Sequence, residues 1–190
     1  IYFKETLKSI KQQTFKKFEL IIVYDDYDKS ELIYVKKILS QFKIKTKLII
    51  NKNIIGAGLS RNKALKISKG NFIAFCDADD TWKKNKLKFQ INFMKKNNIE
   101  FSHSDYDIID SYSKKIGHFK IPKIITKKDL LKCCDIGLSS VMVSQRLLKK
   151  EKFSSLKTKE DYLLWIQMIK YTKKIIGIKK KLACWGKLDN

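Results

Sequence analysis

Hydrophobic positions in the first half of the chain form short apolar runs, and the segments between them have the spacing of amphipathic helices. The runs at residues 18–24, 46–50 and 72–76 are continuous rather than alternating, which is typical of strands buried on both faces of a sheet. Helices are predicted before and between them, at residues 4–13, 30–42 and 59–68. This order predicts an α/β fold with a central, mostly parallel sheet and helices on both faces.

The second half of the chain has a less regular pattern. Strands are predicted at residues 99–103, 139–143 and 174–178, and helices at residues 83–97, 129–134, 145–150 and 158–172. Residues 111–126, which include Gly117 and Pro122, are predicted to form an exposed loop. Trp165 lies on the apolar face of the last predicted helix, so we expect it in the core.

Two of the apolar runs end directly in carboxylates. Asp25 and Asp26 follow the first run, and Asp77, Asp79 and Asp80 follow the third. Ligands bind beyond the carboxyl ends of the strands in open α/β sheets, and clustered carboxylates repel one another unless a cation lies between them. The sequence therefore predicts a divalent metal with a bound phosphate group at this edge, because hard cations prefer oxygen ligands.

The spacing of Asp77 and Asp79 would place both side chains on the same side of an extended chain. The alternative for this stretch is a strand end that runs into a helix, with Thr81 or the aspartate before it as the capping residue. A further acidic pair, Glu160 and Asp161, lies in the first turn of a predicted helix, where the helix dipole alone would favour carboxylates.

The composition is that of a folded protein, since 44% of the 190 residues are hydrophobic and 32% are charged. The length predicts one domain with a sizeable core. No apolar run has transmembrane length, and no signal-peptide pattern is present. The cysteines lack Cys-x-x-Cys spacing, which favours a reduced, cytoplasmic setting.

The formal net charge is +23, and lysines supply nearly all of the positive charge. Such a charge favours contact with nucleic acid or with an anionic membrane surface. The alternative is a solvated surface in a chain with biased residue usage, which the even spread of the lysines supports. No basic stripe with interleaved aromatic residues is present, so nucleic acid is not an expected partner. A weak peripheral contact with an anionic membrane remains a hypothesis.

Several motifs follow one another in a specific order. They are Gln13-Thr14 with the run to Val23, Asp25-Asp26, GLSRNKA at residues 58–64, GNFIAFCDADD at residues 70–80, SSVM at residues 139–142, and EDYLLW at residues 160–165. In order and spacing they resemble a family 2 glycosyltransferase with the nucleotide-diphospho-sugar transferase (GT-A type) fold. The resemblance spans most of residues 5–175. It implies a single Rossmann-like domain, in which residues 1–104 bind the nucleotide sugar and residues 105–190 form the acceptor side.

The resemblance implies an inverting transfer of one sugar from a nucleotide diphosphate sugar to an acceptor hydroxyl. The acceptor would be a saccharide or a lipid-linked sugar, in the synthesis of a cell-surface polysaccharide or glycolipid at the inner face of the membrane. Asp25 or Asp26 would hydrogen-bond the nucleotide base, and Arg61 would lie near the nucleotide. Asp77 would face the ribose or the metal.

The resemblance also implies a metal site and a general base. Asp79, with Asp77 and Asp80 as further ligands, would hold Mn²⁺ or Mg²⁺ between the two phosphates of the donor. Asp161 would accept the proton of the acceptor hydroxyl, with Glu160 as the second candidate. A carboxylate can do this when it is positioned within hydrogen-bond reach of that hydroxyl.

The sequence departs from the family pattern in two places. The family's first strand is missing ahead of Ile1, so we expect that the chain is N-terminally truncated. The Gln-x-x-Arg-Trp motif of processive polysaccharide synthases is missing after Trp165, which favours the transfer of a single sugar.

Two other functions are kept as alternatives. Residues 77–81 also fit the Asp-x-Asp-x-Thr motif of haloacid-dehalogenase-like phosphatases, with Asp77 as the nucleophile. That motif normally lies on the first strand of its domain, whereas two predicted strands precede it here. The other alternative is a non-catalytic basic module that binds nucleic acid or a membrane, for which binding would depend steeply on salt.

Overall fold

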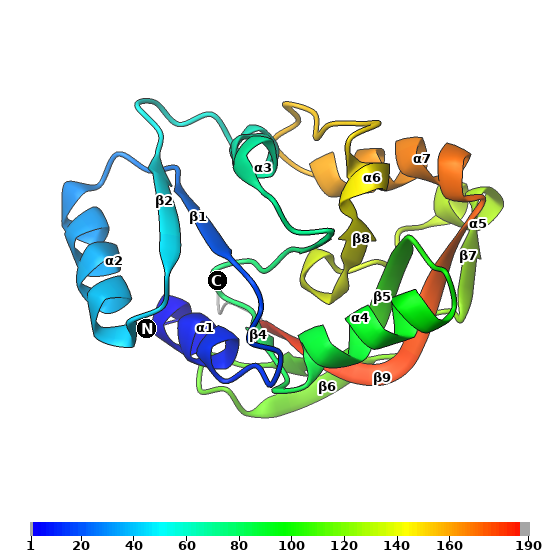
Figure 1. The fold of residues 1–190 in the computed structure, drawn as a ribbon, viewed down its shortest axis with the longest axis horizontal. Coiled ribbons are helices and arrows are strands. Elements are labelled where there is room, and N and C mark those ends of the chain that lie inside the picture. Colours follow the sequence, from blue (N-terminus) through cyan, green and yellow to red (C-terminus); the bar gives the residue numbers. More distant parts are fainter. Residues whose placement is uncertain (1, 187–190) are drawn as a thin grey trace.

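The computed structural model describes residues 2–186, and its strands belong to two sheets (Figure 1). The smaller sheet pairs β1 (Leu20–Tyr24) with β2 (Thr46–Ile50) in parallel over their whole lengths. The connection is α2 (Lys29–Phe42), which is capped by the Asp28 carboxylate, 2.7 Å from Ser30 N. This part of the chain has the predicted strand–helix–strand order.

The larger sheet has the strand order β3-β8-β5-β9-β4, with β6 paired to β5 and β7 paired to β9. Its strands are β3 (Phe72–Ala74), β4 (Thr81–Trp82), β5 (Phe101–Ile109), β6 (Lys115–Phe119), β7 (Ile124–Thr126), β8 (Met142–Ser144) and β9 (Lys174–Gly186). Among these described strands β5 and β9 run parallel, and the other pairs are antiparallel. The predicted α/β class is confirmed, and the sheet arrangement is mixed.

The third apolar run has a different partner from the one that the sequence suggests. The sequence predicts it in one parallel sheet with the first two runs, whereas β3 pairs antiparallel with β8. A continuous apolar run indicates a buried strand but does not specify the direction of its neighbour. The helix α3 (Ala57–Ile67) lies between the two sheets and contacts both β1 and α7 (Glu160–Thr172) (Figure 1).

α7 supplies the centre of the main hydrophobic core. Trp165 is fully buried, as predicted, and its ring centre lies 4.9 Å from that of Phe101 and 6.3 Å from that of Phe75. The remaining helical elements are α1 (Tyr2–Lys11), α4 (Lys86–Lys96), α5 (Lys127–Lys132), the 3₁₀ helix η1 (Leu138–Ser140) and α6 (Gln145–Leu148). None of the helices within residues 2–186 is long and apolar enough to cross a membrane.

Several segments differ from the predicted secondary structure. The strand predicted at residues 139–143 begins as the 3₁₀ helix η1, and the strand predicted at residues 99–103 continues to Ile109. Residues 111–126 contain β6 and β7 instead of a loop. Most side chains of β6 are exposed or half-buried, so it shows neither an apolar run nor a clean alternation. The last strand does not end at residue 178 but continues to Gly186. The predicted end falls before residues 179–181, which are exposed lysines, whereas Leu182 and Ala183 beyond them return to the core. The longer β9 extends the wall of the site described next.

Candidate active site

Asp25 fixes the loop that leads from β2 into α3. Its carboxylate accepts hydrogen bonds from the Asn51 side chain (2.8 Å) and from the backbone N–H groups of Ile55 (3.0 Å) and Gly56 (2.8 Å). Burial raises the pKa of Asp25, but these hydrogen bonds outweigh it and hold the pKa below its usual value. Asp26 is exposed beside it, after the end of β1. The predicted pair therefore consists of a half-buried anchor and an exposed carboxylate.

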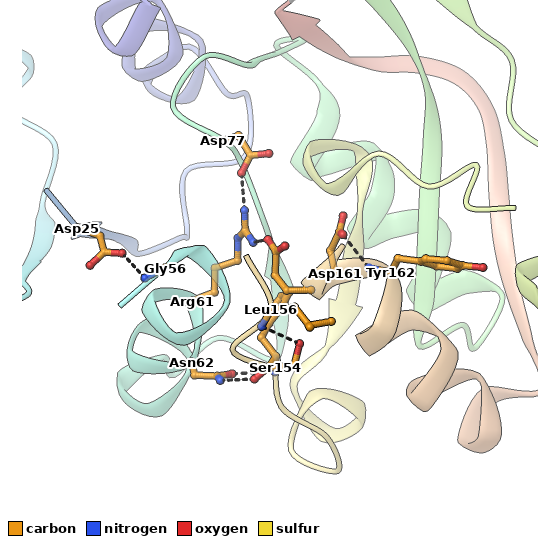
Figure 2. Close-up of polar contacts among 11 residues, drawn as sticks. Asp25, Gly56, Arg61, Asn62, Asp77, Ser154, Leu156, Asp161 and Tyr162 are labelled. Atoms are coloured by element: carbon orange, nitrogen blue, oxygen red, sulfur yellow. Dashed lines mark hydrogen bonds and ion pairs between the residues drawn. The ribbon is translucent and has the colours of Figure 1, made fainter. Parts of the chain in front are cut away.

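Arg61 joins three segments that are far apart in the sequence (Figure 2). From α3, its Nη2 lies 2.9 Å from Asp77 Oδ1, and its Nη1 donates to Glu160 Oε1 at the start of α7. The guanidinium carbon also lies 5.5 Å from the centre of the Phe153 ring. Glu160 is only 7% exposed, so the ion pair with Arg61 is largely buried. Arg61, which is predicted to lie near the nucleotide, therefore contacts two other candidate site residues. Asp77 is the candidate that would face the ribose or the metal, and Glu160 is the second candidate for the general base.

The acidic stretch after β3 is a turn rather than a continuation of the strand. Asp80 N donates to Asp77 O at 3.2 Å, and Asp77 N donates to Ser139 Oγ at 3.0 Å. The expectation that Asp77 and Asp79 share one side of an extended chain does not hold, because β3 ends before them. Asp80 is buried and accepts from Gly186 N at 2.9 Å, and burial raises its pKa to about 7.

Asp79 borders a different cavity from the other two carboxylates of the turn. It lines a small cavity of about 20 Å³ together with Tyr2 and Glu5. Burial, and then the charge of Asp77, raises the pKa of Asp79. Within residues 2–186, no group of three or more His, Cys, Asp or Glu side chains is arranged to hold a metal. Asp77, Asp79 and Asp80 each offer carboxylate oxygens, and Mg²⁺ is usually bound by one or two carboxylates together with the phosphates of a ligand.

A larger cavity, of about 260 Å³, lies between the acidic turn and α7. Asp77 and Asp80 line it from one segment, and Asp161 lines it from another. The Asp161 carboxylate accepts a hydrogen bond from Tyr162 N at 2.7 Å. Burial, and then the neighbouring Glu160 charge, raises the pKa of the Asp161 carboxyl. Asp161 therefore borders the cavity, whereas the neighbouring Glu160 carboxylate is paired with Arg61.

The 3₁₀ turn that forms the floor of this cavity is held by buried polar side chains. Trp82 Nε1 donates to Ser139 O at 2.9 Å, and Gln90 Nε2 donates to Ser140 O at 3.0 Å. Lys86 Nζ lies 3.4 Å from Ser140 O and 4.8 Å from the centre of the Trp82 ring. Lys86 is fully buried, and burial lowers its pKa to about 7. These contacts, together with the Ser139 hydroxyl, fix the acidic turn against the rest of the molecule.

Tyr106 on β5 and Trp185 on β9 complete the wall of the larger cavity. Sequence analysis did not single out either residue. Tyr106 lies beyond the predicted end of its strand at residue 103, and Trp185 lies beyond the predicted end of the last strand at residue 178. For Trp185, the sequence shows only a tryptophan after a lysine-rich segment, and this pattern by itself does not indicate a functional site.

The sequence profile of the family described as Glycosyl transferase family 2 matches residues 2–156. The chain belongs to this family. The matched residues include Asp25, Arg61 and the acidic turn, and they end before Glu160 and Asp161. The alternative of a haloacid-dehalogenase-like phosphatase with Asp77 as the nucleophile finds no support in the comparisons.

Curated relatives are similar over most of the chain. It is 39% identical over 165 residues to the Escherichia coli UDP-Glc:alpha-D-GlcNAc-diphosphoundecaprenol beta-1,3-glucosyltransferase WfgD, covering 87% of the chain and 63% of WfgD. It is 29% identical over 193 residues to the putative teichuronic acid biosynthesis glycosyltransferase TuaG of Bacillus subtilis, covering 100% of the chain and 75% of TuaG. The chain thus spans less than two thirds of the length of WfgD.

Solved structures share the fold. The S. aureus TarS 1–349 structure in complex with UDP-GlcNAc has a TM-score of 0.77 at 22% identity, covering 100% of this chain and 56% of that one. The Pyrobaculum calidifontis mannosyltransferase PcManGT, in complex with GDP-Man and Mn²⁺, has a TM-score of 0.73 at 12% identity, covering 96% and 52%. The predicted GT-A type fold is confirmed by these likenesses.

Proposed function

We propose that the chain carries the active site of an inverting glycosyltransferase that moves one sugar from a nucleotide diphosphate sugar to an acceptor hydroxyl. The observation that carries the proposal is the position of Asp161. It lines the same cavity as Asp77, and Arg61 bonds both Asp77 and the residue before Asp161. A carboxylate with a raised pKa therefore lies beside the proposed donor site. Membership of glycosyltransferase family 2 supports glycosyl transfer.

In the proposed reaction the acceptor hydroxyl oxygen attacks the anomeric carbon of the donor sugar. The bond from that carbon to the diphosphate oxygen breaks, and the nucleotide diphosphate leaves with the bonding electron pair. Asp161 takes the proton of the hydroxyl as general base. Attack on the face opposite the leaving group inverts the anomeric centre. Glu160 is the weaker candidate for the base, because its carboxylate is already bonded to Arg61.

The nucleotide is assigned to the edge formed by β1 and α3. Asp26 is exposed there, and Asp25 is half-buried and hydrogen-bonded by Asn51, Ile55 and Gly56, with the Ser60 hydroxyl as a further partner. Either carboxylate can accept from the N–H of a nucleotide base. Arg61 lies between this edge and the cavity, near the proposed position of the phosphates, and Asp77 faces the ribose or the metal.

We further propose that Mn²⁺ or Mg²⁺ binds together with the donor. Asp79 is the principal candidate ligand, since Asp77 is paired with Arg61 and Asp80 accepts from Gly186 N. Asp77 and Asp80 are the secondary candidates. A divalent cation there would neutralise charge on the departing diphosphate. The name of the PcManGT structure, which includes Mn²⁺, supports this assignment by analogy of fold.

The name of one curated relative indicates which donor and acceptor to propose for this chain. The name of WfgD specifies UDP-glucose as donor and an α-GlcNAc diphosphate lipid as acceptor. We propose a UDP-sugar donor and a lipid-linked or saccharide acceptor, in the synthesis of a surface polysaccharide or glycolipid. Residues 1–104 would bind the donor, and residues 105–190 would form the acceptor side. The proposed setting is the cytoplasm, with peripheral contact to the anionic inner face of the membrane.

Calorimetric titration with UDP, GDP and dTDP, each with and without Mn²⁺, tests the proposal. We expect one nucleotide to bind in a metal-dependent way, and Asp79→Ala to lose that binding. Glu31→Ala, at an exposed carboxylate on α2, is the control and should bind normally. A folded protein that binds none of the three nucleotides would contradict the proposed function.

A further inference from the structure

Trp185 is the exposed aromatic residue of the larger cavity. Its side chain is 49% exposed, whereas the preceding residues Leu182, Ala183 and Cys184 are all buried. It lines the cavity together with Asp161. Scattered exposed hydrophobic residues are ordinary on protein surfaces, so the exposure alone carries no meaning. The position of Trp185 in the same cavity as Asp161, the proposed general base, is the observation that suggests a function.

The end of β9 that carries Trp185 lies beside β5 at the cavity. In the parallel pair of β5 and β9, Tyr106 lies opposite Ala183 and Ile108 lies opposite Trp185. Alternate residues of a strand point to the same face, so Trp185 shares a face with Ala183. Tyr106, Ala183 and Trp185 all line the cavity, and so does Cys184, so the end of β9 borders the cavity with three consecutive residues.

The backbone next to Trp185 is held tightly against the acidic turn. Gly186 N donates to Asp80 Oδ1 at 2.9 Å. A Cβ added at Gly186 would lie 2.5 Å from Asp79 O, so the two segments are in direct backbone contact. The indole is therefore carried by a strand end whose distance from the proposed donor site is fixed.

Tyr106 does not offer an equivalent free face. Its ring is stacked on that of Phe119, with 5.2 Å between centres and 9° between planes. An edge of the same ring packs against Gly137, where an added Cβ would lie 3.2 Å from Tyr106 Cε1. Of the two aromatic residues in the cavity wall, Trp185 is the exposed one, and within residues 2–186 its ring is not stacked on another aromatic ring.

The size and chemistry of the cavity suit one sugar ring. Its volume of about 260 Å³ is below the ~300 Å³ at which pockets for drug-sized ligands begin. A hexose carries hydroxyls around its rim and C–H groups on its faces. An indole provides a large apolar surface with a single N–H donor, which complements such a face. Asp161 must lie within hydrogen-bond reach of the acceptor hydroxyl that it deprotonates, so the acceptor ring has to enter this cavity.

We propose that Trp185 determines acceptor specificity: the terminal sugar ring of the acceptor stacks on its indole and is thereby held with a hydroxyl at Asp161. The inference rests on the proposed function, because it assumes that Asp161 is the general base. It places the donor sugar next to the acceptor ring, at the edge of the same cavity that Asp77 lines and near Arg61.

Kinetics on Trp185→Ala and Trp185→Phe in the full chain test the inference. The probes are UDP-glucose as donor and an α-GlcNAc diphosphate with a short alkyl chain as acceptor. We expect Trp185→Ala to raise the acceptor KM about five- to tenfold, which corresponds to the loss of an aromatic stacking contact. The donor KM should not change, and Trp185→Phe should restore most of the acceptor affinity. Tyr112→Ala, at an 89% exposed side chain outside the cavity lining, is the control.

Tryptophan fluorescence provides a readout that does not need turnover. Of the three tryptophans, Trp82 and Trp165 are buried, so a soluble quencher such as acrylamide reaches mainly Trp185. Adding the acceptor probe should protect this fluorescence, and Trp185→Phe should abolish the protected signal.

The two readouts separate failure of the inference from failure of the proposed function. An unchanged acceptor KM in Trp185→Ala, a raised donor KM, or unprotected fluorescence in a protein that binds UDP would overturn the role of Trp185. Absence of nucleotide binding in the folded wild-type protein would instead overturn the proposed function.

Discussion

Lys86 is a fully buried cation whose contacts are with Gln90, Ser140 and the face of Trp82. Burial disfavours its charged form and lowers its pKa from 10.5 to about 7. The unfolded chain therefore binds more protons at this position than the folded chain between about pH 7 and pH 10.5. Stability rises with pH wherever the unfolded state binds more protons.

Lys86→Met should remove this pH dependence. We expect the free energy of unfolding of the wild type, relative to Lys86→Met, to increase as the pH rises from about 7 towards 10.5. Below this window both states of the wild type carry the charge, so the difference should be constant. Urea unfolding of the two proteins across the range measures it. A difference that does not change with pH would contradict the lowered pKa.

Glu160 gives a second prediction at the residue scale. Glu160→Gln leaves the Arg61 guanidinium, whose side chain is 20% exposed, without one of its two carboxylates. Breaking a largely buried pair in this way costs about 3 kcal/mol of unfolding free energy. Glu5→Gln, which breaks an exposed pair with Lys8, is the matched control and should cost less than about 1 kcal/mol. Equal effects of the two changes in urea unfolding would argue against a structural ion pair at Arg61.

Residues of the candidate site could be proposed from the sequence where chemistry and position coincide, and their roles stay predictions. Carboxylates directly after apolar runs indicate Asp25 and the acidic turn, and the family resemblance adds Arg61 and Asp161. The hydrogen bond between Ser139 and Asp77 N connects residues 62 positions apart, so local pattern does not indicate it. The same applies to Trp185, whose meaning depends on the register of β5 and β9.

At the scale of elements, the close packing of α3 against the start of α7 sets the geometry of the site. Gly58, in the first turn of α3, leaves no room for a side chain, because an added Cβ would lie 2.3 Å from Ser154 O. The same Cβ would lie 3.1 Å from Glu160 Cγ. A larger residue there must push the two segments apart.

Gly58→Ala should therefore destabilise the protein by about 1–3 kcal/mol, the usual cost of overpacking, and should weaken nucleotide binding because Arg61 moves with α3. Gly117→Ala is the control, since its Cβ would make only an ordinary contact of 3.6 Å with Ile108. Thermal unfolding and UDP titration of both variants measure the two effects. Gly58→Ala with wild-type stability and affinity would contradict the close contact.

The types of most elements follow from sequence, but their pairing does not. Continuous apolar runs correctly predict the strands β1, β2 and β3, but the burial on both faces that such runs indicate is not found, because the side chains of β1 and β3 are half-buried and Lys47 and Ile50 of β2 are exposed. The antiparallel pairing of β3 with β8 joins segments about 70 residues apart in sequence and leaves no local signal. β6 is an edge strand with little buried surface, so its residues resemble those of a loop.

At the scale of the whole molecule, the net charge of +23 gives a prediction about membranes. We expect the protein to sediment with vesicles containing phosphatidylglycerol and not with vesicles of phosphatidylcholine alone. Added salt should release it, because the screening length falls from about 10 Å at 0.1 M to about 3 Å at 1 M. Binding to both vesicle types alike, or binding that salt does not change, would contradict an electrostatic contact.

The central claim is that Asp161 is the general base of a sugar transfer. The most direct test compares wild-type protein and Asp161→Asn for transfer from UDP-glucose to the α-GlcNAc diphosphate probe, with UDP affinity measured on the same samples. We expect transfer to fall about 10²- to 10⁴-fold, the usual contribution of a general base, while UDP affinity is retained.

Burial raises the pKa of Asp161, and a base works only when it is deprotonated. The wild-type rate should therefore increase with pH, and its midpoint should lie above the ordinary aspartate value of 3.8. Transfer by Asp161→Asn at the wild-type rate, in a protein that binds UDP, would contradict the account.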